Sequence, residues 1–288
     1  MTDWIGTIIQ GSLLGGLYAL FAIGLSITYG VMRVVNIAHG DFIVLAAYLA
    51  LIPISLLGLH PFVVVLPVVA VMFVLGYVLQ RVLLNRTLGP DILPPLLVTF
   101  GLSILIQNGL LELFTADSQA LQVGDLSTAS LQLAGGISIG VFPLLVFVVS
   151  LLLTLGISLL FNRTSVGMAL RATSDDPDTA GLMGIRARHV YAMAMGLSFA
   201  LVAVGGVLSG VRTTFTPASG PASLLYAFEA VVIGGLGSLW GTFAGAIILG
   251  ISQAIGEEIN AGFGVLFGHL VFLAVLIFKP TGLFARTR

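Results

Sequence analysis

Residues 42–80 read FIVLAAYLALIPISLLGLHPFVVVLPVVAVMFVLGYVLQ and contain no charged side chain. A helix needs about 20 apolar residues to cross a bilayer core, so this stretch is too long for one crossing. The tetrapeptide GLHP at 58–61 divides it, because Gly and Pro interrupt helices and Pro suits the first turn of a new one. We therefore expect two consecutive membrane-spanning helices, at about 42–57 and 62–80.

The composition of the whole chain agrees with a membrane location. Only 8% of the 288 residues are charged and 58% are hydrophobic, whereas soluble domains carry roughly 25% charge. A water-soluble globule is excluded, and so is a disordered chain, which needs low hydrophobicity. The net charge of −1 offers no basic patch for nucleic acid, and the absence of cysteine excludes disulfides and thiolate metal sites.

Charge-free runs elsewhere predict an all-α polytopic membrane protein with about 8–9 transmembrane helices. The other spans are expected at about 5–30, 92–113, 138–161, 190–211, 224–237, 239–255 and 261–279. Nine crossings place ten of the 11 Lys and Arg residues on one side and only Arg212 on the other. By the positive-inside rule, the N-terminus is then outside and the C-terminus is cytoplasmic. The loop at about 114–137 is expected outside, and the loop at about 162–189 in the cytoplasm.

The motifs of enzymes and of ATP binding are missing from the chain. The single Lys, Lys279, stands next to a Pro rather than in a phosphate-binding loop, and neither HExxH nor GxSxG occurs. Few carboxylates lie within spans, which gives little support to ion-driven transport. We therefore expect a transport subunit rather than an enzyme, with no cofactor and no metal bound by this chain.

Two apolar stretches, 29–42 and 228–241, are broken by glycine and carry isolated polar residues. Paired broken helices in the two halves of a chain indicate a transport pathway, and they leave open an inverted pseudo-repeat. The candidate translocation path comprises Asn36, His39, Asp41, Glu229, Gly234, Gly235 and Gly237. The alternative is that Asp41 only caps the next helix while Asn36 and His39 lie in interfacial water, and that the glycines form a packing turn.

Glu229 is the plainest intramembrane carboxylate of the chain. A carboxylate in a span usually faces a cavity or a partner. We expect Glu229 to attract a substrate ammonium group, or to pair with Arg33 or Arg212 and gate the cavity. If its helix instead begins near Leu224, Glu229 lies close to the membrane surface and in contact with water. Its short span could also be a half-helix.

The predicted cytoplasmic loop reads as two short helices broken at about 173–176, with Ser174 or Asp175 as the cap of the second. Its apolar residues leave a small apolar surface outside the membrane: Val166, Ala169, Leu170, Leu182, Met183 and Ile185. Such a surface suggests a docking element for another protein. The alternative is that the loop lies on the protein's own cytoplasmic face.

Three motifs resemble the LivH group of branched-chain amino acid ABC transporter permeases. They are the sequence from Gly16 through VNIAHGDF at 35–42, the segments TSVGMALRA at 164–172 and AGLMGI at 180–185, and AFEAVVIGGLGS at 227–238. The motifs cover nearly the whole chain in the expected order. The resemblance implies a single transmembrane permease domain over residues 1–288. It assigns the ATPase-coupling role to the second motif, including Ser165, Gly167, Ala169, Leu170, Arg171, Ala172, Asp175, Ala180, Leu182 and Gly184.

The resemblance also implies the rest of an importer in a bacterial inner membrane. Such permeases work with a second, LivM-like permease, two ATP-binding cassette subunits and an external solute-binding protein, besides the lipid bilayer. The expected cargo is a branched-chain or other hydrophobic amino acid. Permeases for urea and short amides are similar to this group, so such a substrate is the alternative, followed by a secondary carrier or channel.

Overall fold

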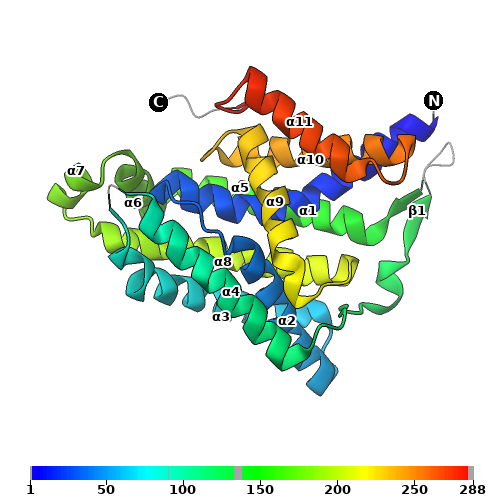
Figure 1. Ribbon diagram of the computed structural model, residues 1–288, viewed down its shortest axis with the longest axis horizontal. Coiled ribbons are helices and arrows are strands. Elements are labelled where there is room, and N and C mark those ends of the chain that lie inside the picture. Colours follow the sequence, from blue (N-terminus) through cyan, green and yellow to red (C-terminus); the bar gives the residue numbers. More distant parts are fainter. Residues whose placement is uncertain (1, 90, 133–137, 285–288) are drawn as a thin grey trace.

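The computed structural model describes residues 2–89, 91–132 and 138–284, and helices dominate these residues (Figure 1). Seven helices of this part of the chain are long and apolar enough to cross a membrane. They are α1 (Thr2–Met32), α2 (His39–Leu57), α3 (Pro61–Val82), α4 (Leu93–Phe114), α5 (Val141–Arg163), α8 (Ala187–Arg212) and α10 (Leu239–Ile259). The prediction of an all-α polytopic membrane protein is confirmed.

Two shorter helices occupy the remaining predicted spans. α9 (Gly220–Gly234) and α11 (Gly264–Phe278) have 15 residues each, which corresponds to about 22 Å and falls short of a hydrocarbon core of about 30 Å. The other short elements are α6 (Ser165–Asp175), α7 (Pro177–Leu182) and the 3-10 turns η1 (Leu84–Arg86), η2 (Gly124–Ser127) and η3 (Pro217–Ser219).

The break between α2 and α3 lies where the sequence predicts it. Gly58 takes a left-handed conformation with φ of 63° and ends α2, and Pro61 is the first residue of α3. The side chain of His60 caps α3 by accepting a hydrogen bond from the backbone N–H of Phe62. Both ends therefore have the local chemistry of a helix stop and a helix start.

The molecule has two distinct ends (Figure 1). We call one the hairpin end, because β1 (Ser130–Gln132) and β2 (Ser138–Gly140) pair there as an antiparallel hairpin in which Leu131 is opposite Ile139, near the N-terminus. We call the other the basic end, which holds α6 and α7. The sequence did not predict the hairpin, and residues 133–137 of the predicted external loop lie outside the described residues.

The core is built on α1, which packs against α8 on one side and α10 on the other. Side chains of α1 and α8 such as Leu20, Ile23 and Phe199 are fully buried. By contrast, α3, α4 and α5 expose apolar side chains outward, and Leu66 and Leu105 are 77% and 70% exposed. This distribution is that of a membrane helix bundle, with a packed interior and an apolar perimeter.

Candidate functional site

The chain turns back into the bundle between α1 and α2. α1 ends at Met32, yet His39, the first residue of α2, donates a hydrogen bond from Nε2 to the carbonyl oxygen of Phe21 at 2.8 Å. Phe21 lies about three turns before the end of α1, or roughly 16 Å along its axis. Residues 33–38 therefore form a re-entrant link, and α2 begins in the interior of the bundle.

The start of α9 meets the start of α2 in this interior. A Cβ atom on Gly40 would overlap the carbonyl oxygen of Gly220, and a Cβ on Gly220 would overlap the carboxylate of Asp41. Only glycine allows two backbones to approach so closely. Asp41 accepts a hydrogen bond from Nε2 of Gln107, on α4, at 2.9 Å. Its carboxylate thus lies at two helix N-termini, where the helix dipoles favour negative charge.

The burial of these residues contradicts the alternative that Asn36 and His39 of the first broken segment lie in interfacial water. Asn36, His39 and Asp41 are 1%, 0% and 1% exposed, so they do not lie in interfacial water. Asp41 does not cap α2 either, because α2 begins at His39 and its N-cap is Ala38. Asn36 instead stabilises the link by accepting a hydrogen bond from the N–H of Ala38 at 3.0 Å.

The second broken segment ends α9 in a tight turn toward the basic end. Gly235 and Gly237 have φ values of 109° and 80°, which glycine adopts without strain. Ser238 then caps α10 by accepting a hydrogen bond from the N–H of Gly241 at 3.2 Å. Gly237 lies against Gly30 near the end of α1. The first broken segment, 29–42, therefore contacts both ends of α9, and it meets the second broken segment at the end near Gly237.

The C-terminal segment closes this end of α9. The backbone N–H groups of Leu283 and Phe284 donate hydrogen bonds to the carbonyl oxygens of Ile233 and Gly234 at 2.9 and 3.0 Å. The last carbonyl groups of a helix have no partner within the helix, so these bonds satisfy two of them. Gly234, Gly235 and Gly237 thus form a turn that is fixed by α1 and by the C-terminal segment.

Glu229 lies deep in the protein and pairs with α11. It is 1% exposed, and its Oε1 accepts a hydrogen bond from Nδ1 of His269. The expected pairing with Arg33 or Arg212 is not present, because the carboxylate faces the neighbouring helix α11 rather than either arginine. The alternative that Glu229 lies near the helix start and is exposed to water is also wrong. α9 begins at Gly220, which places the buried Glu229 in its third turn.

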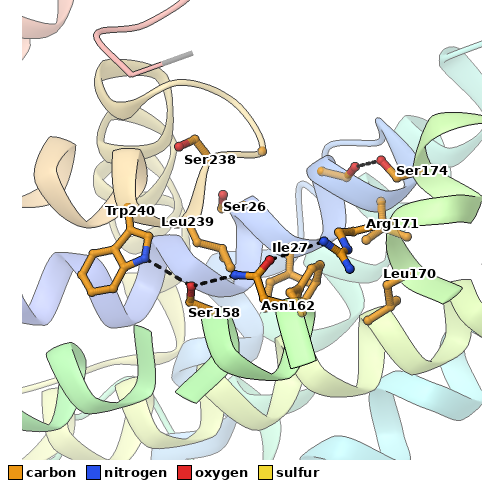
Figure 2. A pocket seen from close by; sticks show the side chains of 14 residues that line it. Ser26, Ile27, Ser158, Asn162, Leu170, Arg171, Ser174, Ser238, Leu239 and Trp240 are labelled. Carbon is orange, nitrogen blue, oxygen red and sulfur yellow. Dashed lines mark hydrogen bonds between the residues drawn. The ribbon is translucent and has the colours of Figure 1, made fainter. Parts of the chain in front are cut away.

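A cavity of about 250 Å³ lies where the two broken segments meet α5 and α6 (Figure 2). Its lining includes Gly30 from α1, Asn162 from α5, Arg171 and Ser174 from α6, Gly237 from the α9–α10 turn and Trp240 from the start of α10. The hydroxyl of Ser174 donates a hydrogen bond to the carbonyl of Gly30 at 2.5 Å. This cavity brings together residues of the predicted path and residues of the predicted coupling segment, which are far apart in the sequence.

One wall of this cavity is polar, and the rest combines apolar side chains with glycines and three serines. Figure 2 shows Trp240, Ser158, Asn162 and Arg171 in a row; the indole Nε1 of Trp240 donates to Ser158 at 3.2 Å and Arg171 donates to Asn162 at 3.4 Å. The Nε of Arg171 is buried without a hydrogen-bond partner among the described residues. An arginine with donors to spare beside an apolar surface suits a carboxylate on an apolar molecule.

A second, smaller cavity lies beyond Asp41 toward the hairpin end. It has a volume of about 180 Å³ and is lined by Gln107, Asn108 and Leu111 of α4 together with Thr216 and Pro217 near η3. Gln107 thus contacts the buried Asp41 and also faces this cavity. The described structure therefore holds one cavity on each side of the contact between the starts of α2 and α9.

The predicted coupling segment forms two helices at the basic end. Thr164 caps α6 by accepting a hydrogen bond from the N–H of Gly167, and Asp176 caps α7 by accepting from the N–H groups of Asp178 and Thr179. The Thr179 hydroxyl also donates to Asp176, and these bonds hold the pKa of Asp176 below its usual value. The expectation that Ser174 or Asp175 caps the second helix is wrong, because α6 continues through Asp175.

The apolar surface of this segment differs from the expected one at a decisive position. Leu182 and Met183 are 88% and 80% exposed, but Leu170 is 1% exposed and packs in the core. Leu170 therefore cannot dock a partner in this conformation, contrary to the prediction. Met168, which the sequence analysis did not select, is 62% exposed.

The other predicted coupling residues take varied positions along α6 and α7. Gly167 and Ala180 are buried, Ala169 and Ala172 are half-buried, and Ser165, Asp175 and Gly184 are exposed. Sequence reasoning missed Gln107 and His269, the partners of Asp41 and Glu229. Both are polar residues within apolar spans, and that signal alone marks a residue for attention in a membrane helix.

Comparisons with known proteins agree with this architecture. A family model described as the permease component of the branched-chain amino acid transport system matches residues 7–279. The permease protein BraD of the high-affinity branched-chain amino acid transport system of Pseudomonas aeruginosa is 31% identical, with 98% of this chain and 96% of BraD covered. The match therefore extends over both broken segments and the segment between them.

Two further relatives come from Escherichia coli K12. The permease protein LivH of the high-affinity branched-chain amino acid transport system is 28% identical, with 96% of this chain and 94% of LivH covered. The permease protein LivM of the same kind of system is also 28% identical, but over only 51% of this chain and 35% of LivM. No solved structure gives a significant match. Among the described residues, no group of His, Asp and Glu could hold a metal ion.

Proposed function

The chain belongs to the family of branched-chain amino acid transport permeases, and from this premise we propose that it forms the translocation path for branched-chain amino acids in an ABC importer. It is a transport subunit of a multi-pass membrane protein family rather than an enzyme. The observation that carries the proposal is the cavity at which both broken segments meet α6. α6, which is not one of the membrane-spanning helices, thereby contacts the interior of the bundle directly.

The proposed path follows the seam between residues 30–41 and α9. A cavity lies at each end of this seam, and between them Gly40 and Gly220 are in close contact. Transport then requires the starts of α2 and α9 to separate. During this movement Asp41 either keeps its hydrogen bond from Gln107 or exchanges it for one from another donor. The arginine and apolar lining of the larger cavity suit the carboxylate and the branched side chain of leucine, isoleucine or valine.

Separate subunits are proposed to supply energy and substrate. The family implies a partner permease within an ABC transporter, and we propose a LivM-like chain for that role. Two ATP-binding cassette subunits would bind α6 and α7 through exposed Met168, Leu182 and Met183, and an external solute-binding protein would deliver the amino acid. Movement of α6 would reach the path through the hydrogen bond between Ser174 and Gly30.

The proposed orientation follows from the distribution of cations. We propose a bacterial inner-membrane protein, with residues 1–288 forming one permease domain, α6 and α7 in the cytoplasm and the hairpin end outside. The described cations Arg81, Arg163, Arg171 and Arg188 support this orientation, because they belong to segments that are packed together at the basic end. Arg286 and Arg288, two of the ten cations that the sequence places on the cytoplasmic side, lie outside the described residues.

Uptake of radiolabelled leucine in cells that lack their own branched-chain importers tests the proposal. Co-expression of this chain with its partner subunits should restore uptake, and unlabelled isoleucine or valine should compete while urea should not. Replacing Arg171 with Gln should reduce uptake at least about tenfold, because charge-assisted bonds to a carboxylate are among the stronger polar contacts.

A matched control is the replacement of Arg163 with Gln. Arg163 is exposed at the same end of the molecule but does not line the cavity, so uptake should stay within about twofold of the wild type. Restoration of urea uptake, or equal leucine uptake by both variants, would contradict the proposed substrate or the proposed role of the cavity.

A further inference from the structure

A strongly basic cavity lies where α3 ends and α8 begins, and it shares no lining residue with the cavity at the broken segments. Its volume is about 500 Å³, and it is lined by Arg81, Asn85, Arg186, Ala187, Arg188 and His189. Three of the six lining residues are arginines and none is acidic. This composition differs from that of the cavity at the broken segments and has no role in the path described above.

The arginines of this cavity have no acidic partner within the described residues. Within the described residues the ion pair that forms joins Glu229 of α9 to His269 of α11, away from this cavity, and no ion pair involves Arg81, Arg186 or Arg188. Arg81 donates only to the hydroxyl of Tyr77, at 3.3 Å. Three unpaired guanidinium groups around one cavity repel each other, so an anion that enters the cavity relieves this repulsion.

Hydrogen bonds hold the segments around the cavity together, and the start of α8 also favours an anion. Asn85 donates a hydrogen bond to the carbonyl of Arg188 at 3.0 Å and so joins η1 to α8. The hydroxyl oxygen of Tyr77 and Nδ1 of His189 are 2.9 Å apart and form a hydrogen bond. α8 begins here with Arg186 as N-cap, and no side chain caps it. The positive end of a 26-residue helix thus adds to the charge of the arginines.

An apolar stripe leads from the bilayer to this cavity. Val71, Val74 and Val78 of α3 are 53%, 58% and 47% exposed, and their spacing places them on one helix face. Arg81 follows on the same face, and Val82 beside it is 53% exposed. A molecule with an anionic head in the cavity and an apolar tail along this stripe would contact both surfaces at once.

We propose that this cavity binds the phosphate-bearing headgroup of an anionic phospholipid whose acyl chain lies along α3. Basic pockets between transmembrane helices at the membrane surface are suited to such headgroups. An acidic segment of a partner protein would use the arginines but leave the valine stripe without a role. The phospholipid accounts for both features. It would also link η1 to the start of α8, the helix that directly follows α7 in the sequence.

Lipid binding by the purified full-length chain in nonionic detergent tests the proposal. Fluorescent phosphatidylglycerol should bind at least about tenfold tighter than phosphatidylcholine. The double variant Arg81→Gln/Arg188→Gln should lose this preference, because each cation near a membrane surface contributes about fivefold to the binding of anionic lipid. The charge-preserving double variant Arg81→Lys/Arg188→Lys should retain most of it.

The matched control is Arg163→Gln/Lys279→Gln, which removes two cations from the same end but none from the cavity. It should bind phosphatidylglycerol like the wild type. Equal affinity in the cavity variant and this control would overturn the proposal, as would competition by inorganic phosphate at concentrations comparable to the lipid. If Arg81→Gln/Arg188→Gln binds phosphatidylglycerol like the wild type but no longer co-purifies with the partner subunits, the cavity is a protein contact and the lipid proposal is wrong. Because this experiment measures lipid binding and not transport, its result does not depend on which substrate the permease carries.

Discussion

Three buried side chains that the sequence predicts for the translocation path each keep one polar atom without a hydrogen-bond partner in the described structure. These atoms are Nδ2 of Asn36, Nδ1 of His39 and Oε2 of Glu229. A buried polar group without a partner costs free energy, of the order of 1–3 kcal/mol in proteins. Packing alone would be better served by apolar residues here. The three residues therefore fit a role in a second conformation, in which these atoms find partners.

Glu229 allows this idea to be tested at one carboxylate. Replacing it with Gln keeps its size and its hydrogen bonding to His269 but removes the charge. We expect the variant to assemble with its partners and to transport leucine at least about tenfold more slowly, because the ammonium group of a passing amino acid loses its counter-charge. Uptake and co-purification of the partner subunits are the two measurements.

Replacement of His269 with Gln is the matched control for Glu229. It disturbs the same contact between α9 and α11 but leaves the carboxylate in place. If both variants lose uptake equally, the pair serves only to hold α11 against α9. If neither loses it, Glu229 has no part in transport.

The coupling segment offers a second pair of residues with opposite burial. Leu182→Asp should leave the fold intact, because Leu182 is 88% exposed, and should weaken binding of the ATPase by about 10- to 100-fold through loss of one apolar contact. Leu170→Asp should instead lower the stability of the permease by about 3 kcal/mol or more, because Leu170 is buried. Thermal unfolding in detergent and ATPase binding distinguish the two effects. A stable Leu182→Asp variant that binds the ATPase normally would show that α7 is not the docking element.

At the scale of helices, the charge-free runs predicted the spans well but not where each helix begins within the bundle. The expected spans at about 42–57 and 239–255 correspond to α2 and α10, because hydrocarbon thickness sets helix length. Composition cannot show that α2 begins beside Phe21 or that α9 begins beside Asp41. Those positions depend on contacts between Gly40 and Gly220, which are far apart in the sequence.

The same contact makes a prediction about helix packing. Gly40→Ala places a methyl group on the carbonyl of Gly220, and such overpacking should lower the free energy of unfolding by about 1–3 kcal/mol. Gly101→Ala is the control, because Gly101 is inside α4 and a Cβ there has no neighbour within 4 Å. It should be neutral or stabilise by up to about 1 kcal/mol. Equal melting temperatures for the two variants would show that the starts of α2 and α9 are not in tight contact.

At the scale of the whole molecule, charge and packing divide the protein in the same way. The basic end gathers α6, α7, the start of α8 and the turn after α9, while the hairpin end holds the β hairpin. The tail near Leu283 returns to Ile233, so the C-terminal segment is tied to the basic end. The cation count of the loops predicts this grouping without any knowledge of contacts, because the positive-inside rule depends only on loop charge.

The orientation of the two ends in the membrane is the remaining prediction, and the cysteine-free chain makes it simple to test. Single cysteines at Ser118, before the hairpin, and at Gly184, after α7, are both exposed. A thiol reagent that cannot cross the membrane should label the Ser118→Cys variant in intact cells and the Gly184→Cys variant only after permeabilisation. A cysteine at position 288, outside the described residues, should behave like Gly184→Cys. Labelling of position 288 in intact cells would contradict nine crossings, because an odd number of crossings is what places the two termini on opposite sides of the membrane.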